Sequence, residues 1–135
     1  MGSILAMAEA TILLVEDEPL ILLDLEFAIE DVGGQFVSAS SVAQALAAIE
    51  RAEPPIDVAI LDVNLGRGQT CEPVATELRR LGIPFILHSG DLDRRDETIR
   101  SLGARIIAKP ASAERVVAEA FLEYQQSGGA VSATP

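Results

Sequence analysis

The feature that most constrains the fold is a regular alternation of short apolar runs with longer segments of helical periodicity. The apolar runs are too short to be helices, and they span residues 11–15, 35–38, 57–61, 84–88 and 105–108. Strands that alternate with helices form a parallel sheet, because each parallel pair needs a crossover connection. The pattern therefore predicts an α/β fold with a doubly wound five-stranded parallel sheet, strand order 2-1-3-4-5.

Residues that typically begin or end helices stand at the expected ends of the intervening helices. Pro19 precedes an apolar stripe that stops at Gly33 and Gly34, and Ser41 with Gln44 three residues later has the spacing of a capping box. The helix expected over 92–102 is the weakest, because its few apolar residues lie among many charges.

Composition limits the domain count and the partners. The 135 residues, 49% of them apolar, suffice for one hydrophobic core, which we assign to residues 10–126, with flexible ends over 1–9 and 127–135. A net charge of −11 without a basic run excludes electrostatic binding to nucleic acid or to an anionic membrane. No apolar run approaches the roughly 20 residues of a membrane span, and the first residues lack the basic region of a secretory signal. We therefore expect a cytoplasmic protein. The single cysteine, Cys71, is expected to be a small apolar residue near a helix start.

Acidic and basic side chains follow the predicted strands at the points where those strands end. Glu16 and Asp17 follow the first strand, Asp62 the third, Ser89 the fourth and Lys109 the fifth. In open α/β sheets the ligand site lies at the carboxyl ends of the strands. Three carboxylates there repel one another unless a cation compensates, and an all-oxygen donor set suits Mg²⁺. The spacing thus predicts a Mg²⁺ site beside a carboxylate and an ammonium.

Four separated blocks, ILLVEDEP, AILDVNL, FILHSGD and GARIIAKP, resemble the motifs of the bacterial response-regulator receiver family. They occur in the family's order across roughly residues 10–125. The resemblance implies a flavodoxin-like (βα)5 receiver fold, and it implies that Asp62 accepts a phosphoryl group from a sensor histidine kinase or a phosphotransfer protein and takes part in holding Mg²⁺. It also implies that the chain catalyses only its own phosphorylation and dephosphorylation, without being an enzyme in the wider sense.

The same resemblance assigns the remaining site residues. Asp17 would bind Mg²⁺ directly, Glu16 would act through metal-bound water, and the backbone carbonyl of Asn64 would complete the protein ligands. Lys109 would pair with the phosphoacceptor and then with the phosphoryl oxygens. Ser89 would hydrogen-bond the phosphoryl group and report its presence by moving inward.

Two positions depart from the family pattern. Gly66 stands where the family commonly carries Pro, so we expect the loop after Asp62 to be more flexible or differently shaped. Ile106 stands where many members carry Tyr or Phe, whose ring moves inward when the hydroxyl moves. In this chain Ser89 would have no aromatic side chain that responds to it in this way. Coupling from the site to the surface would then use the segment 90–102 instead, or be weak.

The expected function is a phosphorylation-dependent switch of a two-component system, in a stand-alone receiver with no DNA-binding output domain that signals by protein contact or phosphoryl relay. The expected partner face, for a homodimer as well, combines helix 92–102, strand 105–108 and helix 112–125. A Mg²⁺-dependent aspartate phosphatase of the haloacid-dehalogenase type stays as an alternative, although that family carries a second Asp where this chain has Asn64. A phosphate-independent receiver-like binding module is the other alternative.

His88 and Ser89 are adjacent, with Asp91 close by, which invites comparison with a hydrolase triad. Neighbouring residues of a strand point to opposite faces, however, so His88 cannot activate Ser89. We expect His88 to be packed or solvent-facing on the side away from Ser89.

Overall fold

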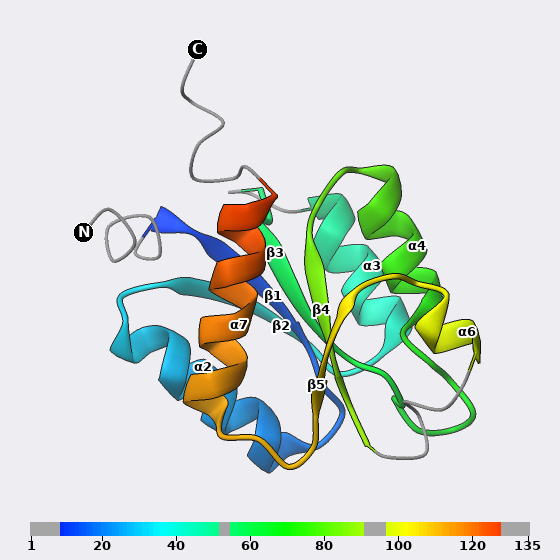
Figure 1. Ribbon diagram of the computed structural model, residues 1–135, viewed down its shortest axis with the longest axis horizontal. Helices are drawn as coiled ribbons and strands as arrows, with labels where there is room; N and C mark the ends of the chain where they lie inside the picture. The colour runs from blue at the N-terminus through cyan, green and yellow to red at the C-terminus, as the bar shows by residue number, and fades with distance from the viewer. Residues whose placement is uncertain (1–8, 52–54, 91–96, 128–135) are drawn as a thin grey trace.

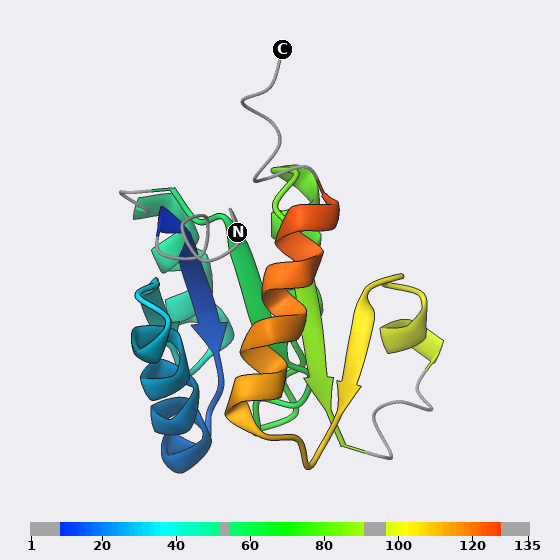
Figure 2. The same ribbon diagram turned by 60° about the vertical axis from the view of Figure 1, so that its left-hand side comes forward.

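Five parallel strands form one sheet in the computed structural model, which describes residues 9–51, 55–90 and 97–127. The strands are β1 (Thr11–Val15), β2 (Gln35–Ala39), β3 (Val58–Asp62), β4 (Phe85–Ser89) and β5 (Arg105–Ala108). Their order, β2-β1-β3-β4-β5, confirms the predicted topology. Every pairing in the sheet is parallel, as the arrows of β1, β4 and β5 show in Figure 2, so the carboxyl ends of the strands meet at one edge of the sheet.

Three strands differ by one residue from those predicted. β2 ends one residue later, whereas β3 and β4 are each shifted one residue along the chain, so that β3 begins at Val58 and ends on Asp62, which pairs with His88 in the ladder. Asp57, which was expected to open the third strand, lies just before it and accepts a 2.8 Å hydrogen bond from the Thr11 backbone through its carboxylate. Apolar content marks the centre of a strand, whereas hydrogen bonds to neighbouring strands set its ends.

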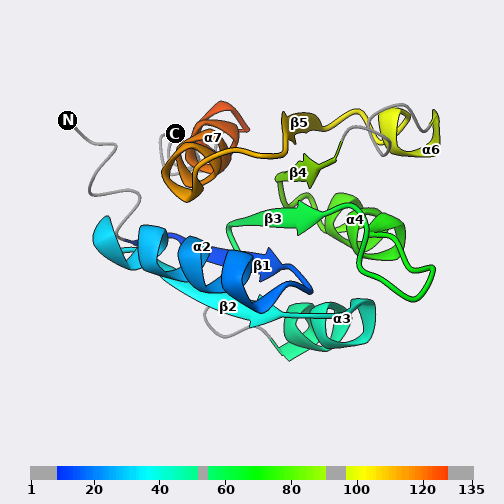
Figure 3. The ribbon, with the colours of Figure 1, turned by 90° about the horizontal axis from the view of Figure 1, so that it is seen from below.

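Helices cover both faces of the sheet. They are α2 (Pro19–Asp31), α3 (Val42–Arg51), α4 (Glu72–Arg80), α6 (Glu97–Arg100) and α7 (Ala113–Gln126). Figures 1 and 3 show α2 and α7 side by side on one face, with α3, α4 and α6 on the other. The double-wound arrangement follows from right-handed crossovers that place successive helices on opposite sides where the strand order reverses.

The two hydrophobic layers use alternate residues of the same strands. Leu13, Leu61 and Leu87 pack toward α3 and α4, whereas Leu14 and Ile60 pack toward α2 and α7. Every residue of β1, β3 and β4 is buried. Strands buried on both faces read as continuous apolar runs, which is why periodicity alone did not separate their two sides.

Local signals at the helix ends operate largely as predicted. Pro19 occupies the first turn of α2, and Gly33, at φ 79°, closes that helix with a backbone hydrogen bond to Glu30. The Ser41 hydroxyl accepts from the Gln44 backbone at 3.1 Å, but the Gln44 side chain accepts from Ser40 rather than closing the box on Ser41.

The remaining segment predictions are covered only in part. Of the helix expected over 92–102, the structure describes α6 from Glu97 onward, and residues 91–96 lie outside the described part of the chain. The expected flexible ends also lie outside it, apart from Glu9 and Ser127, and Ser127 forms the C-cap of α7. No helix in the described ranges is long and apolar enough to cross a membrane.

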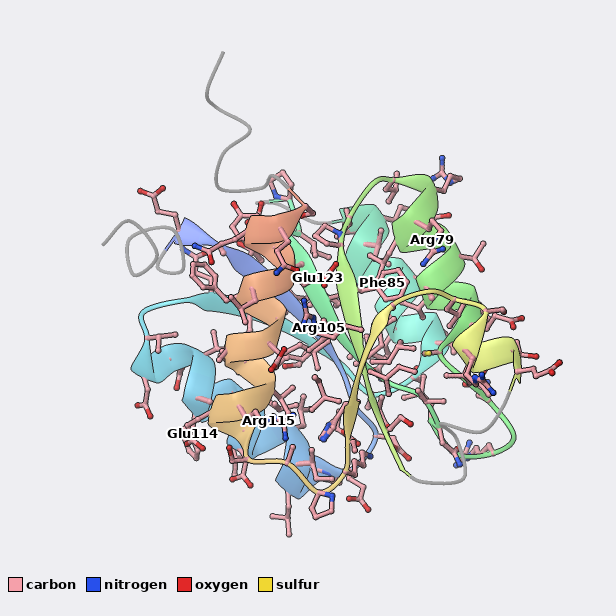
Figure 4. All side chains as sticks on the ribbon, in the orientation of Figure 1. Arg79, Phe85, Arg105, Glu114, Arg115 and Glu123 are labelled. Carbon is pink, nitrogen blue, oxygen red and sulfur yellow. The ribbon has the colours of Figure 1, made fainter. Side chains whose placement is uncertain are left out.

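Ion pairs and other polar side-chain contacts attach helices to the strands β4 and β5. The Arg105 guanidinium forms ion pairs with Glu119 at 3.2 Å and Glu123 at 3.3 Å, both on α7, and Figure 4 shows Arg105 and Glu123 side by side. On the other face Arg79 of α4 lies over the ring of Phe85, 5.5 Å from its centroid, and donates a hydrogen bond to the carbonyl of Leu102. These contacts hold α7 against β5 and α4 against β4.

Candidate functional site

Acidic side chains from two strands converge at the carboxyl edge of the sheet. Glu16 and Asp17 come directly after β1, and Asp62 is the last residue of the adjacent β3. One carboxylate oxygen from each lies within 4.8 Å of the others. Glu16 and Asp62 are almost fully buried, at 1% and 3% exposure, whereas Asp17 is exposed. The structure therefore brings together the three predicted acidic ligands.

A lysine closes this cluster from the side of β5. Lys109 follows β5 directly, and its ammonium lies 3.1 Å from Asp62 Oδ1 and 3.9 Å from Glu16 Oε1. Its backbone N–H donates to the carbonyl of Ser89 at 2.8 Å, which ties the start of this loop to the end of β4. The predicted pairing of Lys109 with Asp62 is thus present in the structure.

Burial and mutual repulsion shift the protonation of the acids. Burial, reinforced by the charge of Asp62, raises the pKa of Glu16 to about 8. Burial also raises the pKa of Asp62, although hydrogen bonds from its neighbours oppose the shift. The pKa of Lys109 is raised because the hydrogen bond and attraction of Asp62 outweigh the effect of its own burial. At neutral pH the metal-free cluster consequently retains a proton on Glu16, next to Asp62 and the Lys109 ammonium.

The donor set and its electrostatics fit a divalent cation. All three acids offer oxygen, the donor that Mg²⁺ prefers, and no histidine or cysteine takes part. The attraction of Lys109 does not outweigh the burial and the repulsion from Asp62 that keep the proton on Glu16, and a cation bound here would replace that proton. The side chains that would hold the ion are Glu16, Asp17 and Asp62.

The loop after β3 has an unusual backbone. Gly66, Arg67 and Gly68 all have positive φ, at 78°, 53° and 75°. A proline, with φ fixed near −65°, cannot adopt this shape, so Gly66 gives the loop a different conformation from one built around Pro. A Cβ on Gly66 would lie 3.3 Å from Asp17 Oδ2, so the missing side chain also leaves room for that carboxylate. The structure thus shows at position 66 a backbone conformation that proline could not adopt.

Within the described ranges, Asn64 and Ser89 follow β3 and end β4 and form no hydrogen bond to the carboxylates of the acidic cluster. The Asn64 side chain accepts from the Gly66 backbone at 3.0 Å, so its amide shapes the loop. The Ser89 hydroxyl is fully buried at the end of β4 and donates to the carbonyl of Gly90 at 3.0 Å. Two predictions, the Asn64 carbonyl as a metal ligand and Ser89 as a phosphoryl partner, stay predictions.

Sequence reasoning set His88 aside, but the structure places this residue next to the site. His88 pairs in register with Asp62 and is 4% exposed. Neither ring nitrogen has a hydrogen-bond partner among the described residues. Burial, together with the charge of Lys109, lowers the pKa of His88 to about 4, so the ring is neutral at pH 7. The signal available in the sequence was that residue 88 must face away from Ser89, toward α2 and α7.

Cys71 behaves as predicted for a small apolar residue. It is fully buried at the N-cap position of α4 and belongs to the hydrophobic layer on that face of the sheet. Its backbone N–H donates to Val63 at 3.0 Å, which anchors the far end of the loop that carries Gly66.

Comparison with known proteins identifies the class that this fold and site define. SdrG from Sphingomonas melonis Fr1 is 38% identical, with 87% of this chain and 98% of that chain aligned at a TM-score of 0.71. A response regulator receiver protein from Sinorhizobium medicae WSM419 is 25% identical over 87% of this chain and 96% of that one, at a TM-score of 0.75. The signal receiver domain of a putative Luxo repressor protein from Vibrio parahaemolyticus, at 20% identity, 94% and 98% coverage and a TM-score of 0.75, shares the fold. No protein-family model matches the chain, and no curated protein matches it.

These likenesses, with four motif blocks folded into one acidic site, define a two-component signalling switch. The chain belongs to the response-regulator receiver family.

Proposed function

We propose that the protein accepts a phosphoryl group on Asp62, with Mg²⁺ bound to the acidic cluster, and thereby switches its contacts with partner proteins. The observation that carries this proposal is the position of Asp62. It is the last residue of the central strand β3, it lies within 4.8 Å of two further carboxylates, and it forms a 3.1 Å ion pair with Lys109.

The proposed transfer uses the groups already present in the site. A carboxylate oxygen of Asp62 attacks the phosphorus of a phosphohistidine, a P–O bond forms, and the P–N bond breaks with its electron pair leaving on the donor imidazole, which takes a proton from solvent. The Lys109 ammonium is positioned to neutralise charge on the phosphoryl oxygens, because it already lies at hydrogen-bond distance from Asp62. Mg²⁺ would supply the remaining charge neutralisation.

The donor would be a sensor histidine kinase or a phosphotransfer protein, and the product would act by protein contact or by phosphoryl relay. We propose no turnover of a separate substrate. Asn64 supports this view over a phosphatase, because its side chain is held by the Gly66 backbone and carries no carboxyl for acid–base work.

Transmission from the site would begin at Ser89. Among the described residues, its hydroxyl donates a hydrogen bond to the adjacent Gly90 carbonyl alone, so rotation toward a phosphoryl group would cost one hydrogen bond. Ile106, on the neighbouring strand β5, is half-buried against the α3 and α4 layer. A β-branched side chain has few rotamers and no polar tip, so we propose that Ile106 does not toggle and that the loop beginning at Gly90 carries the change.

Intact-mass analysis after incubation with acetyl phosphate and Mg²⁺ tests the proposal. The expected result is one added phosphoryl group that hydroxylamine removes, that excess chelator prevents, and that Asp62→Asn abolishes. Asp57→Asn, just before the opposite end of β3, is the matched control and should still be labelled. Equal labelling of wild type and Asp62→Asn would move the phosphoacceptor elsewhere, and full labelling in chelator would refute the Mg²⁺ assignment.

A further inference from the structure

The strand β2 forms one edge of the sheet and leaves part of its backbone unpaired (Figure 3). The Gln35 N–H donates to the residue before β1, and the Ala39 carbonyl accepts from the residue after it, so the backbone groups of Gln35 and Ala39 face β1. Because successive residues of a strand direct their backbone groups to alternate sides, those of Phe36 and Ser38 face outward. Among the described residues, these outward N–H and carbonyl groups have no hydrogen-bond partner.

This edge lacks the features that usually prevent an edge strand from pairing. Natural edges are protected by charged side chains, by proline, by a bulge or by a very short strand. β2 reads QFVSA, without charge or proline, and all 5 of its residues pair with β1 in unbroken register. The opposite edge, β5, is one residue shorter and carries Arg105, whose guanidinium is bound to α7. The unprotected backbone of β2 is therefore suited to receive a further strand from a partner protein.

A groove of about 600 Å³ lies between β2 and α3. Its lining is mostly apolar or small, with Val37 on β2 and Ala47 and Ala48 on α3, and Arg51 is the charged residue that lines it. A strand added about 4.8 Å beyond β2 would direct every second side chain toward this groove. Those side chains would be apolar or short, because the guanidinium of Arg51 disfavours a cation among them.

The other side of the same edge is acidic. The carboxylate of Glu26, on α2, accepts a 2.6 Å hydrogen bond from the Ser38 hydroxyl, so this carboxylate lies beside β2. Glu30 follows one turn later on the same face of α2 and is exposed. Residues four apart on a helix are separated by about 6 Å along its axis, which nearly equals the spacing of about 6.6 Å between alternate residues of a strand. Two basic residues separated by one position on the added strand would therefore each meet a carboxylate.

Charge complementarity selects the partner. α2 and β2 contain acidic residues but no basic ones, and the net charge of the chain is −11. This charge opposes pairing with a second copy of the chain and favours a basic segment. We propose that β2 binds an extended segment of a partner protein in which two Lys or Arg residues flank an apolar residue. The basic side chains lie against α2, and the apolar one lies in the groove beside α3.

This inference goes beyond the proposed function, because it requires neither Mg²⁺ nor phosphorylation. The test uses the unphosphorylated full chain in chelator, so its failure leaves the assignment of Asp62 untouched. The probe is the peptide Thr-Lys-Val-Lys-Thr, acetylated and amidated so that its ends carry no charge. Lys-Lys-Val-Thr-Thr is the matched control, with the same composition but with its lysines on opposite faces of a strand. Thr-Glu-Val-Glu-Thr reverses the charge.

We expect the probe to move the amide proton signals of Phe36 and Ser38 downfield in NMR spectra, because these groups gain hydrogen bonds. Val37, whose N–H faces β1, should shift less. The control peptide should bind about fivefold more weakly, since one of its lysines lies on the side of the groove instead of meeting a carboxylate. The glutamate peptide should not bind at millimolar concentration.

Ser38→Pro removes an outward N–H and should lower the affinity for the probe about tenfold. The fold accepts this change, because proline is tolerated on an edge strand where the N–H faces away from the sheet. Ser38→Ala is the matched control, since it loses the hydrogen bond to Glu26 but keeps the N–H, and it should bind at least as tightly as the wild type. Glu30→Lys should weaken binding of the probe and strengthen that of the glutamate peptide. Asp24→Lys, exposed on the side of α2 toward α7, should change neither.

Equal affinity for the two lysine peptides, or equal affinities of Ser38→Pro and Ser38→Ala for the probe, would overturn the proposal. Signal shifts that spare Phe36 and Ser38 would do the same, as would absence of binding at millimolar concentration. If sedimentation instead showed a dimer that Ser38→Pro dissociates, β2 would pair with a second copy of this chain, and the assignment of a basic partner would be wrong.

Discussion

The proton on Glu16 makes the stability of the metal-free protein depend on pH in a defined window. The pKa of this carboxyl is raised from 4.5 to about 8 in the folded protein. Between those values the folded state binds a proton that the unfolded state has released, so the free energy of unfolding falls as the pH rises, and it levels off above about 8. The site is thus strained at alkaline pH unless a cation is bound.

The size of the effect follows from the same two pKa values. A single group changes the free energy of unfolding by at most about 1.4 kcal/mol per pH unit. Because the folded pKa of about 8 lies at the upper end of the range from pH 7 to pH 8, the carboxyl is only partly deprotonated there. We therefore expect the free energy of unfolding to fall by about 1 kcal/mol between pH 7 and pH 8. His88 does not contribute to this loss, because its pKa is lowered from 6.5 to about 4. Its effect on the free energy of unfolding changes between those two pH values and is nearly constant above them.

Urea denaturation in chelator at pH 7, 8 and 9 measures this loss. Glu16→Gln removes the titrating group and should flatten the profile, whereas Glu18→Gln, an exposed neighbour, should leave it unchanged. Saturating Mg²⁺ should stabilise the wild type more at pH 8 than at pH 7, because the ion competes with fewer protons. If the wild type and Glu16→Gln lost the same free energy between pH 7 and 8, Glu16 would not hold the proton and the argument from crowded carboxylates would fail.

Three further outcomes are expected. Mg²⁺ binding at pH 7 should release a proton from the buried carboxyl, so calorimetric heats should vary with the ionisation enthalpy of the buffer, and identical heats in phosphate and Tris would contradict this. Gly66→Ala and Gly68→Ala should each lower the free energy of unfolding by about 1 kcal/mol, because both glycines have positive φ. Only Gly66→Ala should also weaken Mg²⁺ binding, because only its Cβ approaches Asp17. Equal Mg²⁺ affinities in titrations of the two variants would show that this contact does not matter. Ser112→Ala should cost about 1 kcal/mol in urea denaturation, since the Ser112 hydroxyl accepts from the Arg115 backbone at the start of α7, and an unchanged midpoint would mean that solvent replaces the cap.

Much of the fold could be predicted because its determinants are local or follow from general packing rules. Pro19 and Gly33 mark the ends of α2 through backbone geometry alone, and the alternation of strands and helices leaves few topologies for a parallel sheet. The acidic site could be anticipated too, because carboxyl ends of adjacent parallel strands must meet at one edge. The strand boundaries could not, since pairing of Asp62 with His88 depends on register between strands.

By itself, the sequence determined which residues gather at that edge: Glu16, Asp17, Asp62 and Lys109 each follow or end a strand, and chain connectivity brings strand ends together. Only the tertiary structure decided their chemical state. The pKa of Glu16 and that of His88 depend on burial by segments distant in the chain and on the charges of Asp62 and Lys109. Burial and electrostatic fields are sums over the whole fold, and a local pattern of residues does not contain them.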